Sequence, residues 1–399
     1  MAMSSIGAHK GTFNNNKKKG NLMKTIIKSV ALTSLLAAGT VTASDSTSLT
    51  SAQLSPAQPL HIADLKREAA SYISNHADIF TASVTAELSV NNLAVQLDQL
   101  STNKQLQRHI DTLNIIDDRM IAHKGIGRYE QDILEIRLAD ESMLPAVKRG
   151  QSALFAWEPA GDESTWTHIE AFDASGSIHY LSTEELPQQP VFVIDINQSK
   201  SIAAGVKVMQ SVLAKKGMTQ AVPQDRIESS IAVTTLDKIR LNDDQEPWIS
   251  GKAEIYGVVT GIDPSRDEPH LDIVDMPYLD HDEKTYYPGQ VVIYWDRYRY
   301  QAADLLLMEH DDNTNYQTII TGLLDIATQA LNTFGQPEFA AITYITSQII
   351  SLFPGSWFTN DDDYVDVFYT LRKGYSYTNK NGASANAKAD FRPLTIQSN

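Results

Sequence analysis

The sequence contains no cysteine. A disulfide framework and a thiolate metal site are therefore excluded. Basic residues are also scarce: 33 Lys and Arg stand against 49 Asp and Glu, which gives a formal net charge of −16. This balance disfavours nucleic acid as a partner, because nucleic-acid binding needs a basic face.

Common catalytic and phosphate-binding motifs are missing as well. No His-Glu-x-x-His, Gly-x-Ser-x-Gly or phosphate-loop pattern occurs in the chain. The sequence therefore leaves open whether the protein is an enzyme. It names no catalytic residue and no substrate.

The N-terminus is typical of a targeting segment. Met23–Lys28 is a short basic stretch, Ser29–Gly39 is apolar, and Val41–Ala43 offers small residues for cleavage before Ser44. The apolar part is too short for a stable membrane span. We predict that residues 1–43 are a leader and secretory signal peptide, and that the protein is exported to the periplasm or secreted.

Cleavage would make the chain more acidic. Residues 1–43 hold six lysines and no acidic residue, so their loss changes the net charge from −16 to −22. Such a chain repels an anionic membrane unless divalent cations intervene. We expect no resident transmembrane segment after signal removal. Residues 1–22 receive no predicted role.

Hydrophobic periodicity divides the remaining chain. Residues 44–60 are a polar linker, and residues 61–217 begin with helical spacing and change to a period of two near residue 132. Residues 218–228 form a second linker, and residues 229–399 are rich in strand patterns. We predict an α+β fold, with a helical and antiparallel-sheet region followed by a β-sandwich.

One segment interrupts the strand patterns. Residues 317–353 contain two apolar helical runs joined by Gly335-Gln-Pro337. Between Tyr316 and Asn360 the only charged residues are Asp325 and Glu338. This pattern predicts a helical hairpin inserted into the β-sandwich.

Three acidic clusters lie at the ends of strand-like runs in the second region. Calcium prefers several carboxylate oxygens in a loose geometry, and loops between strands can gather them. The clusters therefore predict a calcium site. The candidate metal ligands are Asp280, Asp282, Glu309, Asp311, Asp361, Asp362 and Asp363.

The acidic arrangement resembles that of C2 domains, which are calcium-dependent β-sandwich modules. Asp362-Asp-Tyr-Val-Asp366 is similar to the family's Asp-Asp-Phe-Leu-Gly stretch, with Asp366 in place of glycine. The resemblance implies ligands at Asp280, Asp282, Asp311 and Asp361–Asp363. The hairpin is a departure from that family. The whole chain also resembles an uncharacterised family of exported bacterial proteins, which implies no activity.

Other functions stay open at this point. The acidic clusters could be solvated loop ends, or the site of a metal-dependent hydrolase in which His281 or His310 helps to activate water. The hairpin could reach a lipid or protein partner when calcium binds, or it could pack onto the sandwich. An aromatic run could bind sugar or peptide, or pack across a sheet; it comprises Tyr286, Tyr287, Tyr294, Trp295, Tyr298 and Tyr300.

Overall fold

The computed structural model describes residues 60–101, 104–161, 165–218, 230–242, 247–250, 255–281, 283–309, 313, 315–352 and 364–397. The predicted signal segment, the first linker up to residue 59, and the second linker after Met218 lie outside this set. Residues 58–399 belong to one unit of the chain. All contacts below are within that unit.

The described chain begins with helices. α1 buries Ile62, Leu65, Ala69 and Ile73 on one face, as the helical spacing predicted. The side chain of His61 caps this helix by accepting a hydrogen bond from the backbone N–H of Ala63. The helices of this part are α1 (Ile62–Ser74), α2 (Ala77–Glu87), α3 (Leu97–Leu100) and α4 (Gln107–Lys124).

A six-stranded sheet follows, in the order β1-β2-β6-β3-β4-β5. Every pairing is antiparallel except the parallel pairing of β3 with β6. β6 is buried along its whole length, as expected of a strand in the interior of a sheet. The elements are β1 (Ala94–Gln96), β2 (Leu134–Leu138), η1 (Glu141–Met143), α5 (Leu144–Lys148), β3 (Leu154–Ala156), β4 (Ile169–Phe172), β5 (Ile178–Leu181) and β6 (Val191–Ile196).

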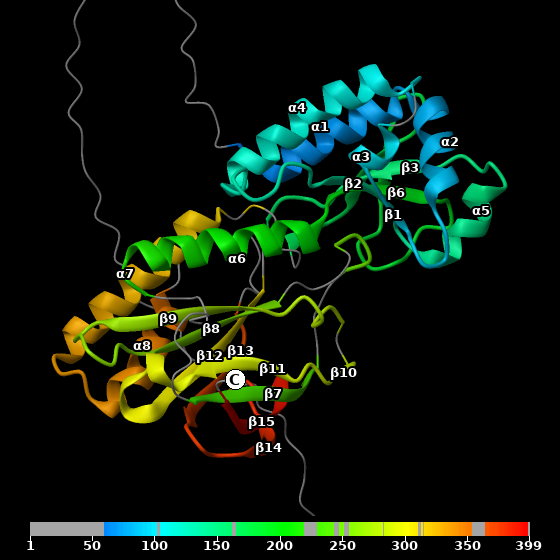
Figure 1. The fold of residues 1–399 in the computed structure, drawn as a ribbon. Helices are drawn as coiled ribbons and strands as arrows, with labels where there is room; N and C mark the ends of the chain where they lie inside the picture. Colours follow the sequence, from blue (N-terminus) through cyan, green and yellow to red (C-terminus); the bar gives the residue numbers. More distant parts are fainter. Residues whose placement is uncertain are drawn as a thin grey trace, which may run out of the picture. The chain divides into compact units, whose positions relative to one another are not determined.

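Helix α6 (Gln198–Lys215) connects the six-stranded sheet to the rest of the protein. It lies along β9 and beside α7 (Figure 1). Gly205 permits this approach, because a Cβ built there would lie 2.0 Å from the ring of Tyr316 on α7. Gly217 follows the helix with a φ of +81°, the left-handed conformation expected of a glycine C-cap.

The C-terminal part contains two further sheets. One has four strands in the order β13-β12-β8-β9, and the other joins β10, β7, β15 and β14, with β11 also paired to β7. Their elements are β7 (Ile231–Leu241), β8 (Ile255–Ile262), β9 (Pro269–Asp275), β10 (Thr285–Tyr286), β11 (Gln290–Tyr294), η3 (Trp295–Arg297), η4 (Arg299–Gln301), β12 (Ala302–Glu309), β13 (Tyr364–Arg372), β14 (Tyr377–Asn381) and β15 (Ala387–Ile396).

These two sheets share a hydrophobic core. Leu236 of β7, Val259 of β8 and Leu305 of β12 belong to one buried cluster, and Phe368 of β13 meets Phe391 of β15 at 5.1 Å between ring centroids. The preceding residue of β8, Val258, belongs instead to the core shared with the N-terminal part. β8 is therefore buried on both faces. The α+β prediction is confirmed.

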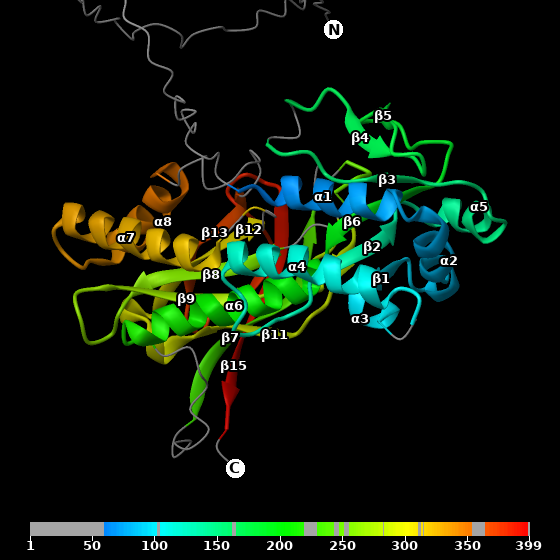
Figure 2. The ribbon, with the colours of Figure 1, turned by 90° about the horizontal axis from the view of Figure 1, so that it is seen from above.

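The predicted hairpin is present as α7 (Tyr316–Phe334) and α8 (Phe339–Leu352), which flank Gly335 with its φ of +84°. Asn315 caps α7 through the backbone N–H of Thr318. The apolar faces of the two helices are buried in the core that also includes β8 and β12, and the hairpin lies beside the four-stranded sheet in Figures 1 and 2. No helix among the described residues is long and apolar enough to cross a membrane.

Candidate functional site

Five of the seven predicted metal ligands lie outside the described residues: Asp282, Asp311, Asp361, Asp362 and Asp363. Asp280 and Glu309 are described. Glu309 ends β12 and pairs with Ile255 at the start of β8. Ile255 and Asp280 line the same cavity, so the two described candidates belong to one end of the sandwich.

Asp280 has well-defined neighbours. Its Oδ1 accepts a hydrogen bond from the hydroxyl of Tyr286 at 2.7 Å. The Lys284 Nζ and the His281 Nε2 lie 3.7 and 3.9 Å from its carboxylate. Within the part of the chain that the structure describes, no group of three or more His, Asp or Glu side chains is arranged to hold a metal ion.

Asp366, from the motif that resembles C2 domains, has a structural role. Its side chain is fully buried and accepts hydrogen bonds from the backbone N–H groups of Val367, Ser384 and Ala387 at 2.7–2.8 Å. A Cβ at Gly382 would meet this carboxylate at 2.1 Å. Asp366 therefore holds the turn before β15 against β13, and Gly382 leaves the room for it.

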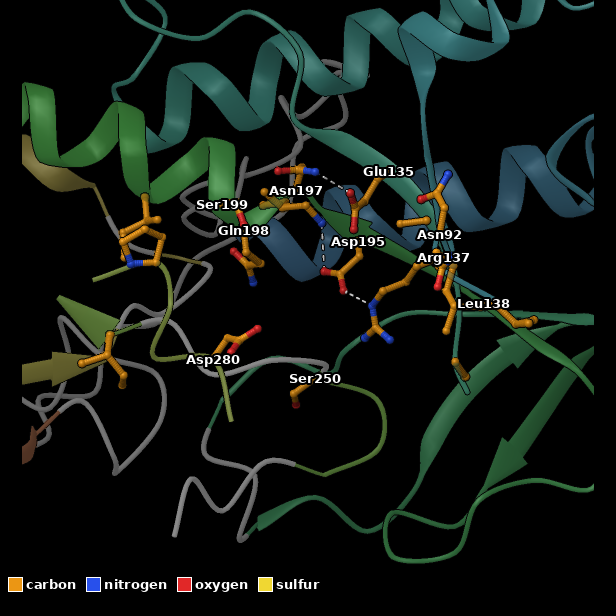
Figure 3. Close-up of a pocket in the computed structure, with 18 of the residues that line it drawn as sticks. Asn92, Glu135, Arg137, Leu138, Asp195, Asn197, Gln198, Ser199, Ser250 and Asp280 are labelled. Carbon is orange, nitrogen blue, oxygen red and sulfur yellow. Dashed lines mark hydrogen bonds and ion pairs between the residues drawn. The ribbon is translucent and has the colours of Figure 1, made fainter. Parts of the chain in front are cut away.

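A cavity of about 490 Å³ lies at this end of the sandwich. One wall comes from β1, β2, β6 and the first turn of α6, and the other from Ser250, Ile255, Met276, Pro277 and Asp280. Figure 3 shows Asp280 across the cavity from Glu135, Arg137 and Asp195. A cavity of this size is in the range of small-molecule sites.

Glu135, Arg137 and Asp195 project from two neighbouring strands. Glu135 and Arg137 are two residues apart on β2 and therefore lie on one face of the sheet. Asp195 is the direct partner of Glu135 across the β2–β6 ladder. The Nε of Arg137 donates to the Oδ2 of Asp195 at 2.6 Å, and its guanidinium also donates to the backbone carbonyl of Ile249.

A lysine from α1 completes this charge network. The side chain of Lys66 is only 1% exposed, and its Nζ lies 2.7 Å from the Oδ1 of Asp195 and 3.2 Å from the Oε2 of Glu158. The other oxygen of Glu158 accepts a hydrogen bond from the hydroxyl of Ser250 at 3.2 Å. The network thus links α1, the six-stranded sheet and the segment that leads into the sandwich.

Glu135 is a carboxyl group in the cavity wall whose pKa is raised. Burial, followed by the neighbouring charge of Asp195, raises the pKa of Glu135 to about 7. Asn197 donates a hydrogen bond to its Oε2 at 2.8 Å and also caps α6 through the N–H of Lys200. The carboxyl group is therefore oriented by the start of α6 and can exchange a proton near neutral pH.

Asp117 on α4 is a buried carboxyl group with a raised pKa that serves as a comparison for Glu135. Its pKa is also raised to about 7, mainly by burial. Its oxygens, however, accept hydrogen bonds from the backbone N–H groups of Ile133 and Leu134, and it is not among the residues that line the cavity. Asp117 holds α4 to β2, whereas Glu135 meets space that a ligand can enter.

Sequence reasoning missed this site, although two signals point to it. Leu134–Leu138 alternates apolar and charged residues, and the apolar run Val191–Ile194 ends at Asp195. A charge beside a buried strand must be paired or functional, because burying it alone is costly. Both signals predict a buried charged site, but neither says that the two strands are neighbours.

The fold and cavity define an α+β protein with a buried acid–base cluster between a mixed sheet and a β-sandwich. A family model described as "Protein of unknown function (DUF3103)" matches residues 66–399. The chain belongs to this family, which agrees with the expected relationship to uncharacterised proteins. No curated protein and no solved structure matches it.

Proposed function

We propose that the protein is a hydrolase whose active site is the cavity between β2, β6 and the 276–280 turn. The observation that carries this proposal is Glu135, a carboxyl group with a pKa near 7 in the wall of a cavity of about 490 Å³. Enzymes use burial and a neighbouring carboxylate to bring a general acid or base to this range.

The surroundings of Glu135 suit the cleavage of a polar bond. Gln198 and Ser199 line the cavity from the first turn of α6, where the helix dipole favours negative charge. Arg137 lies on the same wall, where its guanidinium is held by Asp195 and by the backbone carbonyl of Ile249. A substrate oxygen that gains negative charge is stabilised there, while Glu135 transfers the proton and Asp280 faces the substrate from the opposite wall.

Replacing Glu135 tests this proposal. We expect the wild-type protein to hydrolyse at least one of three fluorogenic classes, namely 4-methylumbelliferyl glycosides, esters or phosphates. Glu135→Gln keeps the shape and an acceptor for Asn197 but cannot transfer the proton, so kcat/KM should fall about 100-fold or more. The wild-type pH–rate profile should have a limb near pH 7 that is lost in the variant.

A matched control is Glu184→Gln, which changes an exposed glutamate outside the cavity and should leave turnover unchanged. Thermal unfolding of both variants would establish that they are folded. Absence of turnover in all three substrate classes, or full activity of Glu135→Gln, would contradict the proposal.

A second function, calcium binding by a C2-like sandwich, is supported by where the strands end. β12 ends at Glu309 opposite Ile255, β13 begins at Tyr364 opposite Met308, and β9 ends at Asp275 opposite Tyr256. The strand ends from which the three acidic segments continue therefore lie at the same end of the four-stranded sheet. Export stays a prediction from Met23–Ala43, and a calcium-dependent lipid or protein partner stays a further possibility of this second function.

If this end of the sheet binds calcium, the ion should stabilise the folded state by mass action. At a calcium concentration about 100 times Kd, the gain is about 2–3 kcal/mol, seen as a higher Tm. Asp280→Asn and Asp362→Asn should reduce the gain, whereas Asp325→Asn, on an exposed part of α7, should not. Melting curves that coincide in millimolar calcium and in chelator would refute this function.

A further inference from the structure

A second cavity lies next to the first, also of about 490 Å³. Aromatic and proline side chains dominate its wall, with one amide and one carboxylate among them. The lining residues are Asp275, Pro277, Tyr278, Tyr286, Tyr287, Pro288 and Gln290. Three tyrosines around one hollow are typical of a binding site more than of a loop that only connects strands.

Hydrogen bonds fix the rings of this cavity in advance. The hydroxyl of Tyr278 donates to the Oε1 of Gln290 at 2.6 Å, and the Nε2 of Gln290 donates to the backbone carbonyl of Asp275 at 2.8 Å. The rings of Tyr278 and Tyr286 lie 6.1 Å apart at 47°. Tyr287, in contrast, is 74% exposed. The cavity therefore offers an ordered wall and one open ring.

The two cavities adjoin at the 276–280 turn. Pro277 lines both of them. The hydroxyl of Tyr286 in the second cavity donates to Asp280, which lines the first, at 2.7 Å. A ligand that occupies both cavities would have to pass Pro277, with Glu135 on one side and Tyr287 on the other. This arrangement is expected of an enzyme that binds several units of a chain-like substrate.

We propose that the tyrosine-lined cavity is a subsite for a neutral oligosaccharide, whose next units enter the Glu135 cavity for cleavage of a glycosidic bond. The cleavage step rests on the proposed hydrolase function; the binding step does not. Water supplies the hydroxyl group to the anomeric carbon, and the departing sugar oxygen takes a proton, so the reaction needs no further reactant. A carboxyl group with a raised pKa is the usual proton donor in this chemistry.

The chemistry of the wall selects this class of ligand. Sugar rings present C–H faces that stack on exposed aromatic rings such as Tyr287, and hydroxyl groups that pair with amides and carboxylates such as Gln290 and Asp275. A polyanionic glycan is disfavoured because the chain carries a net charge of −16. Asp275 and Asp280 at the junction add local negative charge against such a ligand.

Binding to the full chain tests the subsite without relying on turnover. Isothermal titration of the Glu135→Gln protein would use four probes: cellohexaose, chitohexaose, mannohexaose and maltohexaose. At least one should bind, and adding Tyr287→Ala should weaken its affinity about tenfold or more. Adding Tyr375→Ala, which removes a tyrosine that is 57% exposed and lines neither cavity, should change nothing.

The possible outcomes separate the two proposals. No binding of any probe, equal affinity after Tyr287→Ala, or binding of a proline-rich decapeptide in place of the sugars would overturn the subsite. Hydrolysis of an ester or phosphate without sugar binding would overturn the subsite and leave the hydrolase standing. Sugar binding that depends on Tyr287, in a protein whose Glu135→Gln variant loses no activity, would support the subsite and overturn the proposed hydrolase function.

Discussion

Lys66→Ala should lower the free energy of unfolding by about 3–5 kcal/mol, because it removes one of the two cations that pair with the buried Asp195 carboxylate beside Glu135. The Lys66 Nζ lies 2.7 Å from Asp195 and 3.2 Å from Glu158. Without it, Asp195 keeps Arg137 as an ion-pair partner at 2.6 Å but remains beside Glu135. Urea denaturation, followed by circular dichroism, would measure the change.

An exposed ion pair provides the control. Arg119 and Glu68 form a salt bridge of 2.7 Å with side chains that are 42% and 51% exposed, and Arg119→Ala should cost at most about 1 kcal/mol. Lys66→Met, Asp195→Asn and the double variant form a double-mutant cycle that measures the coupling energy of the Lys66–Asp195 pair. A loss below that of Arg119→Ala would mean that the buried network does not stabilise α1 on the sheet.

The elements of this fold could be predicted because the hydrophobic periods are clear. The hairpin of α7 and α8 lies close to the predicted residues 317–353, and α1 begins the region in which the spacing is helical. The pairing of elements could not be read in the same way. Lys66 and Asp195 are 129 residues apart, and only the three-dimensional packing of α1 against β6 brings them together. The candidate site depends on such distant contacts.

The acidic clusters illustrate a second limit of the sequence. A carboxylate at a strand end can bind a cation, cap a turn or accept a hydroxyl, and the sequence is the same in each case. Asp366 accepts hydrogen bonds from backbone N–H groups of Ser384 and Ala387. Asp280 accepts a hydrogen bond from the hydroxyl of Tyr286. Their roles follow from neighbours that the sequence does not specify.

The aromatic run divides between two roles for a similar reason. Trp295 and Tyr298 are 3% exposed and belong to the sandwich core, which is the packing role considered for the whole run. Tyr286 and Tyr287 line the second cavity with Tyr278, a residue outside the run. Strand alternation predicts that neighbours face opposite ways, but it does not say which face meets a cavity.

Acidification from pH 7 to pH 4 should stabilise the wild-type protein relative to Asp117→Asn by about 3 kcal/mol. Burial raises the pKa of Asp117 from 3.8 to about 7, the nearby Asp132 adds to this, and backbone N–H groups of Ile133 and Leu134 oppose it. The folded state therefore binds the proton more tightly than the unfolded state. The stabilisation is fully present below about pH 4 and is lost as the pH rises through 7.

The difference between the two proteins isolates Asp117 from the other acids. Glu135 and Asp304 also have raised pKa values, about 7 and about 6, but they are present in both proteins and cancel. Asp111→Asn, at an exposed position on the same helix, should leave the pH dependence parallel to that of the wild type. Urea titrations at each pH would measure the three curves. A wild-type minus Asp117→Asn difference that stays constant from pH 4 to pH 7 would mean that Asp117 is charged in the folded protein throughout this range, and that its hydrogen bonds to β2 offset its burial.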